Sequence, residues 1–172
     1  GRISPEKDYE RVMRILGRVR SHIPGVRLTI IGTWDRHTAR YFDGLQSLAR
    51  SLGEWIGFRQ DVSRDELRDL MGSHRYGLHG MREGHFGMAP AEMVRAGAIV
   101  WVPNGGGQRE IVGHEPNLVF DSDDDAVRKI SAVLADPREQ ARLRQQLAEL
   151  AGGFSTDRFV REVRHIVATF EG

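Results

Sequence analysis

Stretches in which apolar residues recur at helical spacing alternate with short apolar runs along the whole chain. In the first of these stretches, Tyr9, Leu16 and Val19 fall on one helical face behind a Ser4-Pro5 cap. Caps, glycines and prolines mark the ends of the later stretches in the same way. Together these signals predict a helix from the cap at 4 to the break at 24–25, one over 36–52, a short one that starts at the capping box 63–66, and one over 89–95. A helical turn follows the loop 104–107 and ends at 112. Further helices are predicted over 122–135, starting at 136–137, and from 155 to about 170.

The short apolar runs between the helices are typical of strands and lie at 26–31, 54–58, 74–79, 98–102 and 117–120. Strands that alternate with helices form βαβ units, so we expect the α/β class: a doubly wound parallel sheet with helices on both faces. The 172 residues correspond to a single domain. In open sheets of this kind, ligands bind outside the carboxyl ends of the strands.

Composition removes several classes of function. The chain has no cysteine, which excludes disulfides, thiolate zinc sites and cysteine nucleophiles. Its 25 basic and 24 acidic residues nearly cancel, so no nucleic-acid partner is expected. No apolar run approaches the length of a transmembrane helix. We therefore expect one soluble, globular domain.

Glycines follow three of the predicted strands, at the edge where a ligand would bind: Gly32, Gly80 and 105–107. A further glycine loop, 84–87, leads into the helix that carries Glu92. Glycine lets backbone amides approach an anion, and a helix N-terminus favours one. A tight turn or a flexible loop would explain the same residues. Neither loop matches the dinucleotide fingerprint and the chain has no P-loop, which excludes the classical dehydrogenase and P-loop classes.

Two basic side chains flank the first predicted turn. Arg2 and Lys7 are spaced so that both reach one diphosphate, the arginine as a fork and the lysine as a point charge. Lysine is rare in this chain, since only Lys7 and Lys129 occur beside 23 arginines. The alternative is a pair of solvated charges, although cations are disfavoured at the start of a helix.

Metal-ligating patterns are weak. His74, His79 and His85 are separated by five and six residues, which fits no helical metal pair, and surface or loop histidines explain them better. The acidic run 121–125 lacks the glycine and terminal glutamate of a calcium loop and suits a helix N-terminus. No G-x-S-x-G nucleophile motif is present. We expect no metal site.

The order of the motifs resembles that of a known family. The motifs are G-R-x-x-x-x-K at 1–7, a strand and glycine at 28–32, G-F followed by S-x-x-E-L at 57–67, an acidic F-G region at 83–93, Ala-Gly at 96–97, and G-G-x-x-E-I-V at 106–112. In this order the chain resembles the C-terminal, nucleotide-sugar-binding domain of family 4 (group 1) retaining glycosyltransferases of the GT-B type, from residue 1 to about 170. The resemblance implies a Rossmann-like sheet, the C-terminal half of a GT-B fold.

The resemblance also implies a donor site without an obligate metal or other cofactor. Arg2 and Lys7 would hold the diphosphate of a GDP-, UDP- or ADP-linked hexose, and Glu92 would bind the ribose hydroxyls. The amides around Gly87 and Met88 would support phosphate and sugar. The residues implied to contact the donor are Arg2, Lys7, Gly32, Phe58, Arg59, Gly84, His85, Phe86, Gly87, Met88, Ala89 and Glu92. Of these, the 58–59 segment would lie against the base.

One motif departs from the family pattern. The family's first glutamate stands two residues before Phe-Gly, a position that Gly84 takes here, with Glu83 one residue earlier. Either the loop carries an extra residue and Glu83 is the catalytic acid, or that acid is lost. The second case leaves a non-catalytic nucleotide-sugar-binding module as the alternative function. An α/β protein-interaction domain is a third alternative, but it leaves Arg2, Lys7 and the glycine loops unexplained.

The remaining expectations concern what lies around this domain. Enzymes of the GT-B type act between two domains, and the acceptor-binding N-terminal domain is absent here, so this chain alone is expected to bind donor without transferring it. The surroundings of 78–79 and 85–87 resemble mannosyltransferase members of the family. The family resemblance implies a cytoplasmic protein that reaches the membrane, if at all, peripherally through the missing domain.

Overall fold

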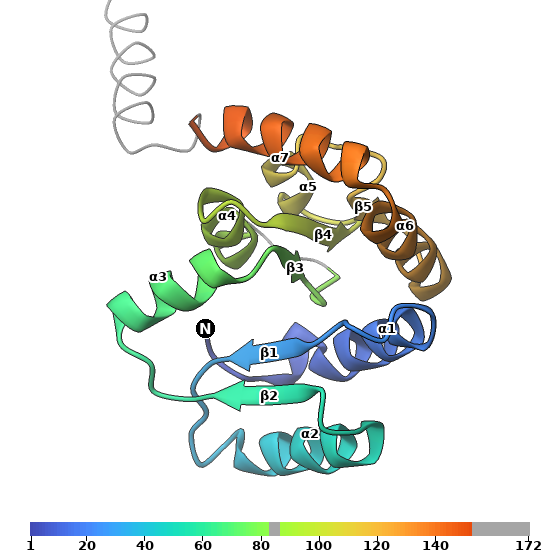
Figure 1. Ribbon diagram of the computed structural model, residues 1–172. Helices are drawn as coiled ribbons and strands as arrows, with labels where there is room; N and C mark the ends of the chain where they lie inside the picture. The colour runs from blue at the N-terminus through green and yellow to red at the C-terminus, as the bar shows by residue number, and fades with distance from the viewer. Residues whose placement is uncertain (83–86, 153–172) are drawn as a thin grey trace, which may run out of the picture.

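The computed structural model describes residues 1–82 and 87–152, in which helices alternate with parallel strands (Figure 1). The strands are β1 (Leu28–Ile31), β2 (Ile56–Arg59), β3 (Tyr76–Leu78), β4 (Ile99–Pro103) and β5 (Val119–Phe120). The helices are η1 (Pro5–Lys7, a 3-10 turn), α1 (Tyr9–His22), α2 (Ala39–Leu52), α3 (Arg64–Ser73), α4 (Met88–Arg95), α5 (Gln108–Ile111), α6 (Asp123–Ala135) and α7 (Pro137–Ala151). The predicted α/β class is confirmed.

The strands form two parallel ladders instead of the one continuous sheet that the sequence predicts. β1 pairs with β2, with Leu28 opposite Ile56. β4 lies between β3 and β5, with Tyr76 opposite Ile99. Gly1 to Ile3 begin a further parallel pairing, because Arg2 bridges Thr33 just beyond the end of β1. Figure 1 shows β1 and β2 in one layer and the three-stranded ladder beyond a gap.

Local capping explains where several helices begin. The hydroxyl of Ser63 accepts from the Glu66 amide while the Glu66 carboxylate accepts from the Ser63 amide, which is the predicted capping box. Ser122 and Asp136 cap α6 and α7 with their side chains, also as predicted. Such caps need partners only two or three residues away, so the sequence alone locates them.

The first predicted helix differs from the structure. The Ser4-Pro5 cap opens only the short turn η1, and Asp8 then adopts a left-handed conformation with φ of 50° before α1 begins at Tyr9. The second helix starts at Ala39 instead of 36. Each strand starts one or two residues later than predicted, β3 also ends one residue earlier, and β2 and β4 end one residue later. The helix predicted from 155 lies outside the described residues.

Two apolar clusters support these layers. The larger surrounds β4, whose five residues are all buried, and it includes residues of α1, α4, α6 and α7. The smaller joins β1 to α1 and α2 through Ile30, Met13 and Leu45. Helix α1 contacts both α2 and α6 and so spans the two ladders. This packing fixes where the carboxyl ends of the strands meet.

Candidate functional site

Three glycines stand where the strands end, and each allows a close backbone approach. A Cβ on Gly80, after β3, would lie 2.5 Å from the carbonyl oxygen of Lys7. A Cβ on Gly32, after β1, would meet the carbonyl oxygen of Gly1, and one on Gly105, after β4, would meet that of Arg82. The loops that follow β1, β3 and β4 are therefore packed together at one edge, with η1 among them.

Lys7 lies at the centre of this edge. Its Nζ approaches the sulfur of Met81 at 3.6 Å, a weak acceptor. Arg2, at the other end of the same turn, is 63% exposed and contacts Glu6 at 3.3 Å. Glu6 also accepts from the Ser4 hydroxyl at 2.6 Å, and this hydrogen bond is the main cause that lowers the pKa of Glu6. Thus Lys7 is held against the β3 loop, while Arg2 is held by a solvent-exposed ion pair.

His79 follows β3 and lies next to Lys7. Burial, and secondarily the charge of Lys7, lower the pKa of His79 from 6.5 to about 4. Its imidazole is therefore neutral at physiological pH and adds no charge beside the ammonium. The sequence suggested a surface or loop histidine; the structure places it in the loop but partly buried.

The N-terminus of α4 packs against Gln108, which follows the loop after β4. Gly87 is its N-cap with φ of 78°, and no side chain in the described part of the chain caps the helix. The Ala91 amide bonds to the Gly87 carbonyl, and Pro90 carries no N–H, so within residues 1–82 and 87–152 the amides of Met88 and Ala89 are the first-turn donors for which no acceptor is found. This is the arrangement that binds anions at helix N-termini. Met88 itself is 72% exposed.

Gln108 connects the two glycine loops, and sequence reasoning missed it. Its fully buried side chain donates from Nε2 to the carbonyls of Met81 at 3.0 Å and Pro103 at 3.2 Å. A Cβ on Gly87 would come within 3.2 Å of Gln108, so Gly87 needs both its positive φ and its small size. Gln108 thus positions the segments that carry the α4 amides.

Other predicted residues lie outside the contacts that join Lys7, Met81 and Gln108. Phe58 packs edge to face against Phe42 with ring centroids 5.2 Å apart, inside the smaller apolar cluster. Arg59 is exposed at the end of β2, and its carbonyl accepts from the Gly32 amide at 3.1 Å. Glu92 is exposed and occupies the fifth position of α4, one turn into the helix. The helix predicted over 89–95 begins one residue earlier, at Met88, so Glu92 does not stand at its start.

Several predicted residues cannot be placed. Glu83, Gly84, His85 and Phe86 lie outside the described residues. Within 1–82 and 87–152, no group of three or more histidines and carboxylates is arranged to hold a metal ion. No helix of that part of the chain combines the length and apolarity needed to cross a membrane.

The acidic run at 121–125 forms the start of α6, as predicted. Asp123 pairs with the buried Arg11 at 2.5 Å, and Asp124 pairs with Arg18 at 2.7 Å. Lys129 donates to Asp125 at 2.8 Å in the same helix. Lys129 therefore has a structural role, and Lys7 is the lysine at the strand-end edge.

Sequence comparison relates the chain to glycosyltransferases. The family of glycosyl transferases group 1 matches residues 1–149. The chain is 25% identical over 173 residues to the human GDP-Man:Man(3)GlcNAc(2)-PP-Dol alpha-1,2-mannosyltransferase, covering 92% of this chain and 35% of that protein. Its counterpart in Dictyostelium discoideum is 28% identical over 122 residues, covering 64% of this chain and 24% of that protein. The chain thus spans about a third or less of the length of these relatives.

Solved structures show the same fold. Anabaena Alr3699/HepE in complex with UDP and glucose superposes with a TM-score of 0.85 at 18% identity, covering 98% of this chain and 47% of that one. The C-terminal domain of the group 1 glycosyl transferase LpcC from Francisella tularensis gives 0.78 at 16% identity, covering 90% and 82%. The fold is therefore that of a GT-B C-terminal domain. Since the family match covers most of its length, the chain belongs to the glycosyl transferases group 1.

Proposed function

We propose that this domain holds the nucleotide-sugar donor of a hexosyltransferase, and that the donor is GDP-mannose. The relatives named above are GDP-mannose-dependent mannosyltransferases, which supports both the sugar and the base. The solved structure with UDP and glucose supports the same kind of ligand on the same fold. Acceptor binding is assigned to another domain, because the chain spans only a third of its relatives, and the isolated domain is expected not to transfer sugar.

One observation carries the proposal: Lys7 and the N-terminus of α4 are linked at the strand ends, because Lys7 contacts Met81, whose carbonyl accepts from Gln108, and Gln108 packs against Gly87. A diphosphate there would receive an ammonium from η1 and the amides of Met88 and Ala89. The neutral imidazole of His79 adds no second charge beside Lys7. Arg2 needs only to exchange its exposed pairing with Glu6 for a phosphate.

These groups favour departure of the nucleoside diphosphate. In transfer, the bond between the anomeric carbon and the β-phosphate oxygen breaks, and the electron pair stays on the phosphate. The anomeric carbon bonds to the acceptor hydroxyl oxygen, and the hydroxyl proton passes to an oxygen of the departing phosphate. The leaving group gains negative charge, so fixed cations and amides beside it lower the barrier. Protein donors would stabilise this negative charge without a metal. We propose that transfer proceeds with retention.

The other roles follow the family resemblance. Glu92 would accept from the ribose hydroxyls, the 58–59 segment would border the base, and Gly32 would be a further donor-binding position. Segment 84–89 would border the phosphates and sugar, and Glu83 would be the catalytic acid. The domain would work in the cytoplasm, with any membrane contact made by the missing domain.

Calorimetric titration with GDP, GDP-mannose, UDP and UDP-glucose tests the proposal. A charge-assisted contact contributes about 1.5–3 kcal/mol, so Lys7→Ala should weaken GDP binding roughly tenfold or more. Arg40→Ala, an exposed arginine on α2, is the matched control and should bind as the unaltered chain does. Equal affinity in Lys7→Ala and the control would refute the phosphate site. Preference for the uridine ligands would refute the assignment of GDP.

The sequence also favours a second candidate, a non-catalytic nucleotide-sugar-binding module, because Gly84 takes the position of the family's first glutamate. The two candidates differ only when an acceptor domain is present. A longer protein that contains this chain and transfers mannose, but slows on Glu83→Gln, identifies Glu83 as the acid. One that binds GDP-mannose without transfer supports the module.

A further inference from the structure

Three aromatic rings form a column beside the carboxyl end of β1. The indole of Trp34, in the loop after β1, stacks on the ring of Phe42 from α2, with ring centroids 3.5 Å apart and an interplanar angle of 15°. Phe42 in turn packs edge to face against Phe58 of β2. Phe42 is buried, whereas Trp34 is only partly buried. Trp34 is therefore the member of the column that belongs to the strand-end loops, and it keeps accessible ring surface.

The other two tryptophans of the chain have structural roles. Trp55 is buried and donates from Nε1 to the carbonyl of Leu52 at 2.8 Å. Trp101 is buried in the larger apolar cluster and donates to the carbonyl of Asn117 at 3.0 Å. Core packing and these hydrogen bonds account for both indoles. They do not account for a large aromatic side chain that is left partly exposed in a loop at the ligand-binding edge of the strands.

The loop that carries Trp34 is held on both sides of the indole. The residue before it, Thr33, is bridged to Arg2. The residue after it, Asp35, accepts with one carboxylate oxygen from the next two amides but one, at 2.8 and 3.1 Å. The indole is thus presented by an ordered loop, so a ligand that stacks on it does not first have to order the chain.

This loop lies next to the proposed phosphate groups. Arg2, which would bind the diphosphate, is the bridge partner of Thr33. Neighbouring strands are about 5 Å apart and consecutive Cα atoms about 3.8 Å, so the backbones of Arg2 and Trp34 lie within about 10 Å of each other. A ribose and its phosphates span a gap of this size. The base of a nucleotide whose diphosphate is held by Arg2 and Lys7 can therefore reach the indole.

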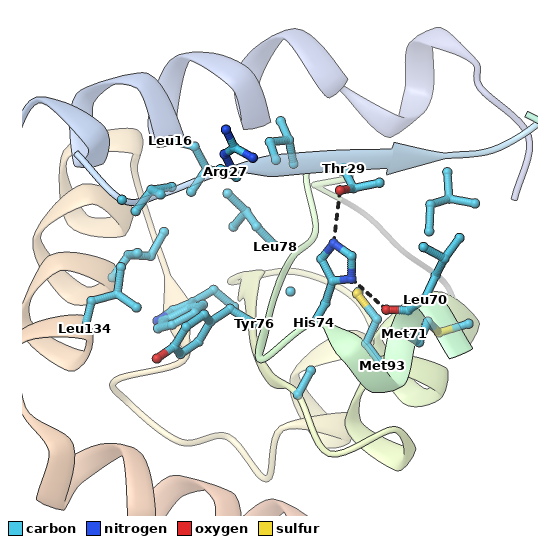
Figure 2. A pocket seen from close by; sticks show the side chains of 18 of the residues that line it. Leu16, Arg27, Thr29, Leu70, Met71, His74, Tyr76, Leu78, Met93 and Leu134 are labelled. Carbon is cyan, nitrogen blue, oxygen red and sulfur yellow. Dashed lines mark hydrogen bonds between the residues drawn. The ribbon is translucent and has the colours of Figure 1, made fainter. Parts of the chain in front are cut away.

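The cavity between β1 and β3 is a poorer place for a base (Figure 2). Its volume is about 430 Å³, and none of the described residues that line it comes from the loops that follow these two strands. His74 lies across the cavity, but both of its ring nitrogens are engaged: Nδ1 is 2.6 Å from the carbonyl oxygen of Leu70, and Nε2 is 3.0 Å from the hydroxyl of Thr29. A base in this cavity would be separated from the phosphate groups, and the imidazole would have no nitrogen to offer it.

We propose that Trp34 is the stacking platform for the base of the nucleotide donor. This inference rests on the proposed function and adds the residue that holds the base: Phe42 supports one face of the indole, and the base covers ring surface that the protein leaves exposed. The Gly32 amide donates to the Arg59 carbonyl at 3.1 Å, so the loop of Trp34 lies beside the 58–59 segment, which would border the same base. Stacking of one base on an aromatic side chain contributes roughly a factor of ten or more in affinity.

Two ligands that differ only in the base test the proposal by calorimetric titration. They are GDP and ribose 5-diphosphate, which has the same sugar and phosphates but no base. Trp34→Leu removes the aromatic surface and keeps an apolar side chain against Phe42, and Trp34→Phe keeps an aromatic ring. Tyr41→Leu is the matched control, because Tyr41 is another partly buried aromatic residue that packs against the smaller apolar cluster.

We expect Trp34→Leu to weaken GDP binding about tenfold and to leave the affinity for ribose 5-diphosphate unchanged. Trp34→Phe should lose less than Trp34→Leu, and Tyr41→Leu should bind both ligands as the unaltered chain does. Equal losses for the two ligands would overturn the proposal, because Trp34 would then only support the fold. If the unaltered chain binds neither ligand, the proposed function falls and this inference with it. If it binds GDP and Trp34→Leu binds GDP equally well, only the role of Trp34 is refuted.

Intrinsic fluorescence keeps the test sharp if Trp34→Leu does not fold. GDP, but not ribose 5-diphosphate, should quench the emission of the unaltered chain, because a stacked guanine quenches an indole. Trp34→Phe retains only the two buried tryptophans, so the quenching by GDP should disappear in this variant. Quenching that persists in Trp34→Phe, or GDP binding without quenching in the unaltered chain, would overturn the proposal.

Discussion

Acid should destabilise this protein through His79. Its pKa in the folded chain is about 4, against 6.5 for an ordinary histidine, because burial and the nearby Lys7 disfavour the charged ring. A histidine with a lowered folded pKa contributes stability that is complete above pH 6.5 and is lost as the pH falls toward 4. Protonation of the unfolded chain then costs about 2 kcal/mol of folding free energy between pH 7 and pH 5.

The assay is urea unfolding of the unaltered chain and of His79→Gln at both pH values. The variant lacks this titration, so its loss between pH 7 and pH 5 should be smaller by about 2 kcal/mol. Other groups titrate in both proteins and cancel in the comparison. A nucleoside diphosphate bound beside Lys7 should raise the His79 pKa, since it brings negative charge. An equal pH dependence in the two proteins would contradict the burial argument.

Three further predictions concern the strand-end edge. Gly80→Ala would place a Cβ 2.5 Å from the Lys7 carbonyl and should lower stability by about 1–3 kcal/mol in urea unfolding, whereas Gly44→Ala, with open space in α2, should not. Gln108→Leu removes the donor to the Met81 carbonyl and one of the two donors to the Pro103 carbonyl, which also accepts from the Gly105 amide, and should cost about 1–3 kcal/mol by the same measurement, with weaker GDP binding. Glu92→Gln should weaken calorimetric binding of GDP but not of its 2′,3′-dideoxy analogue, and equal losses would exclude a ribose contact.

The sequence predicts well those features whose causes are local. The capping box at Ser63 and the caps at Ser122 and Asp136 were found because each joins a side chain to an amide two or three residues away. The buried strand β4 stands out because all its residues are apolar. The ends of β1 and β3 were misjudged, since a strand extends only as far as a partner pairs with it.

The candidate site was predicted less completely, because several of its contacts join residues that lie far apart in the sequence. Lys7 stood out as one of two lysines, and glycines after strands marked the right edge. Gln108 gave no signal, because it bonds to Met81 and Arg82, 27 and 26 residues earlier, which only the folded chain brings near. The sequence identified His79 only as a surface or loop histidine. Its burial could not be predicted, because it depends on how the β3 loop packs against η1.

The structure decides between the two explanations of the glycine loops. Gly80 and Gly105 are small because the backbones of Lys7 and Arg82 pass where their Cβ atoms would stand, so close loop packing accounts for both. Flexibility therefore does not explain these two glycines, and a ligand is not needed to explain them either. The inference of an anion site must rest on groups that find no strong acceptor among residues 1–82 and 87–152: the Lys7 ammonium beside a thioether and the first amides of α4. Those groups are polar donors aimed at one edge, and a diphosphate satisfies both kinds at once.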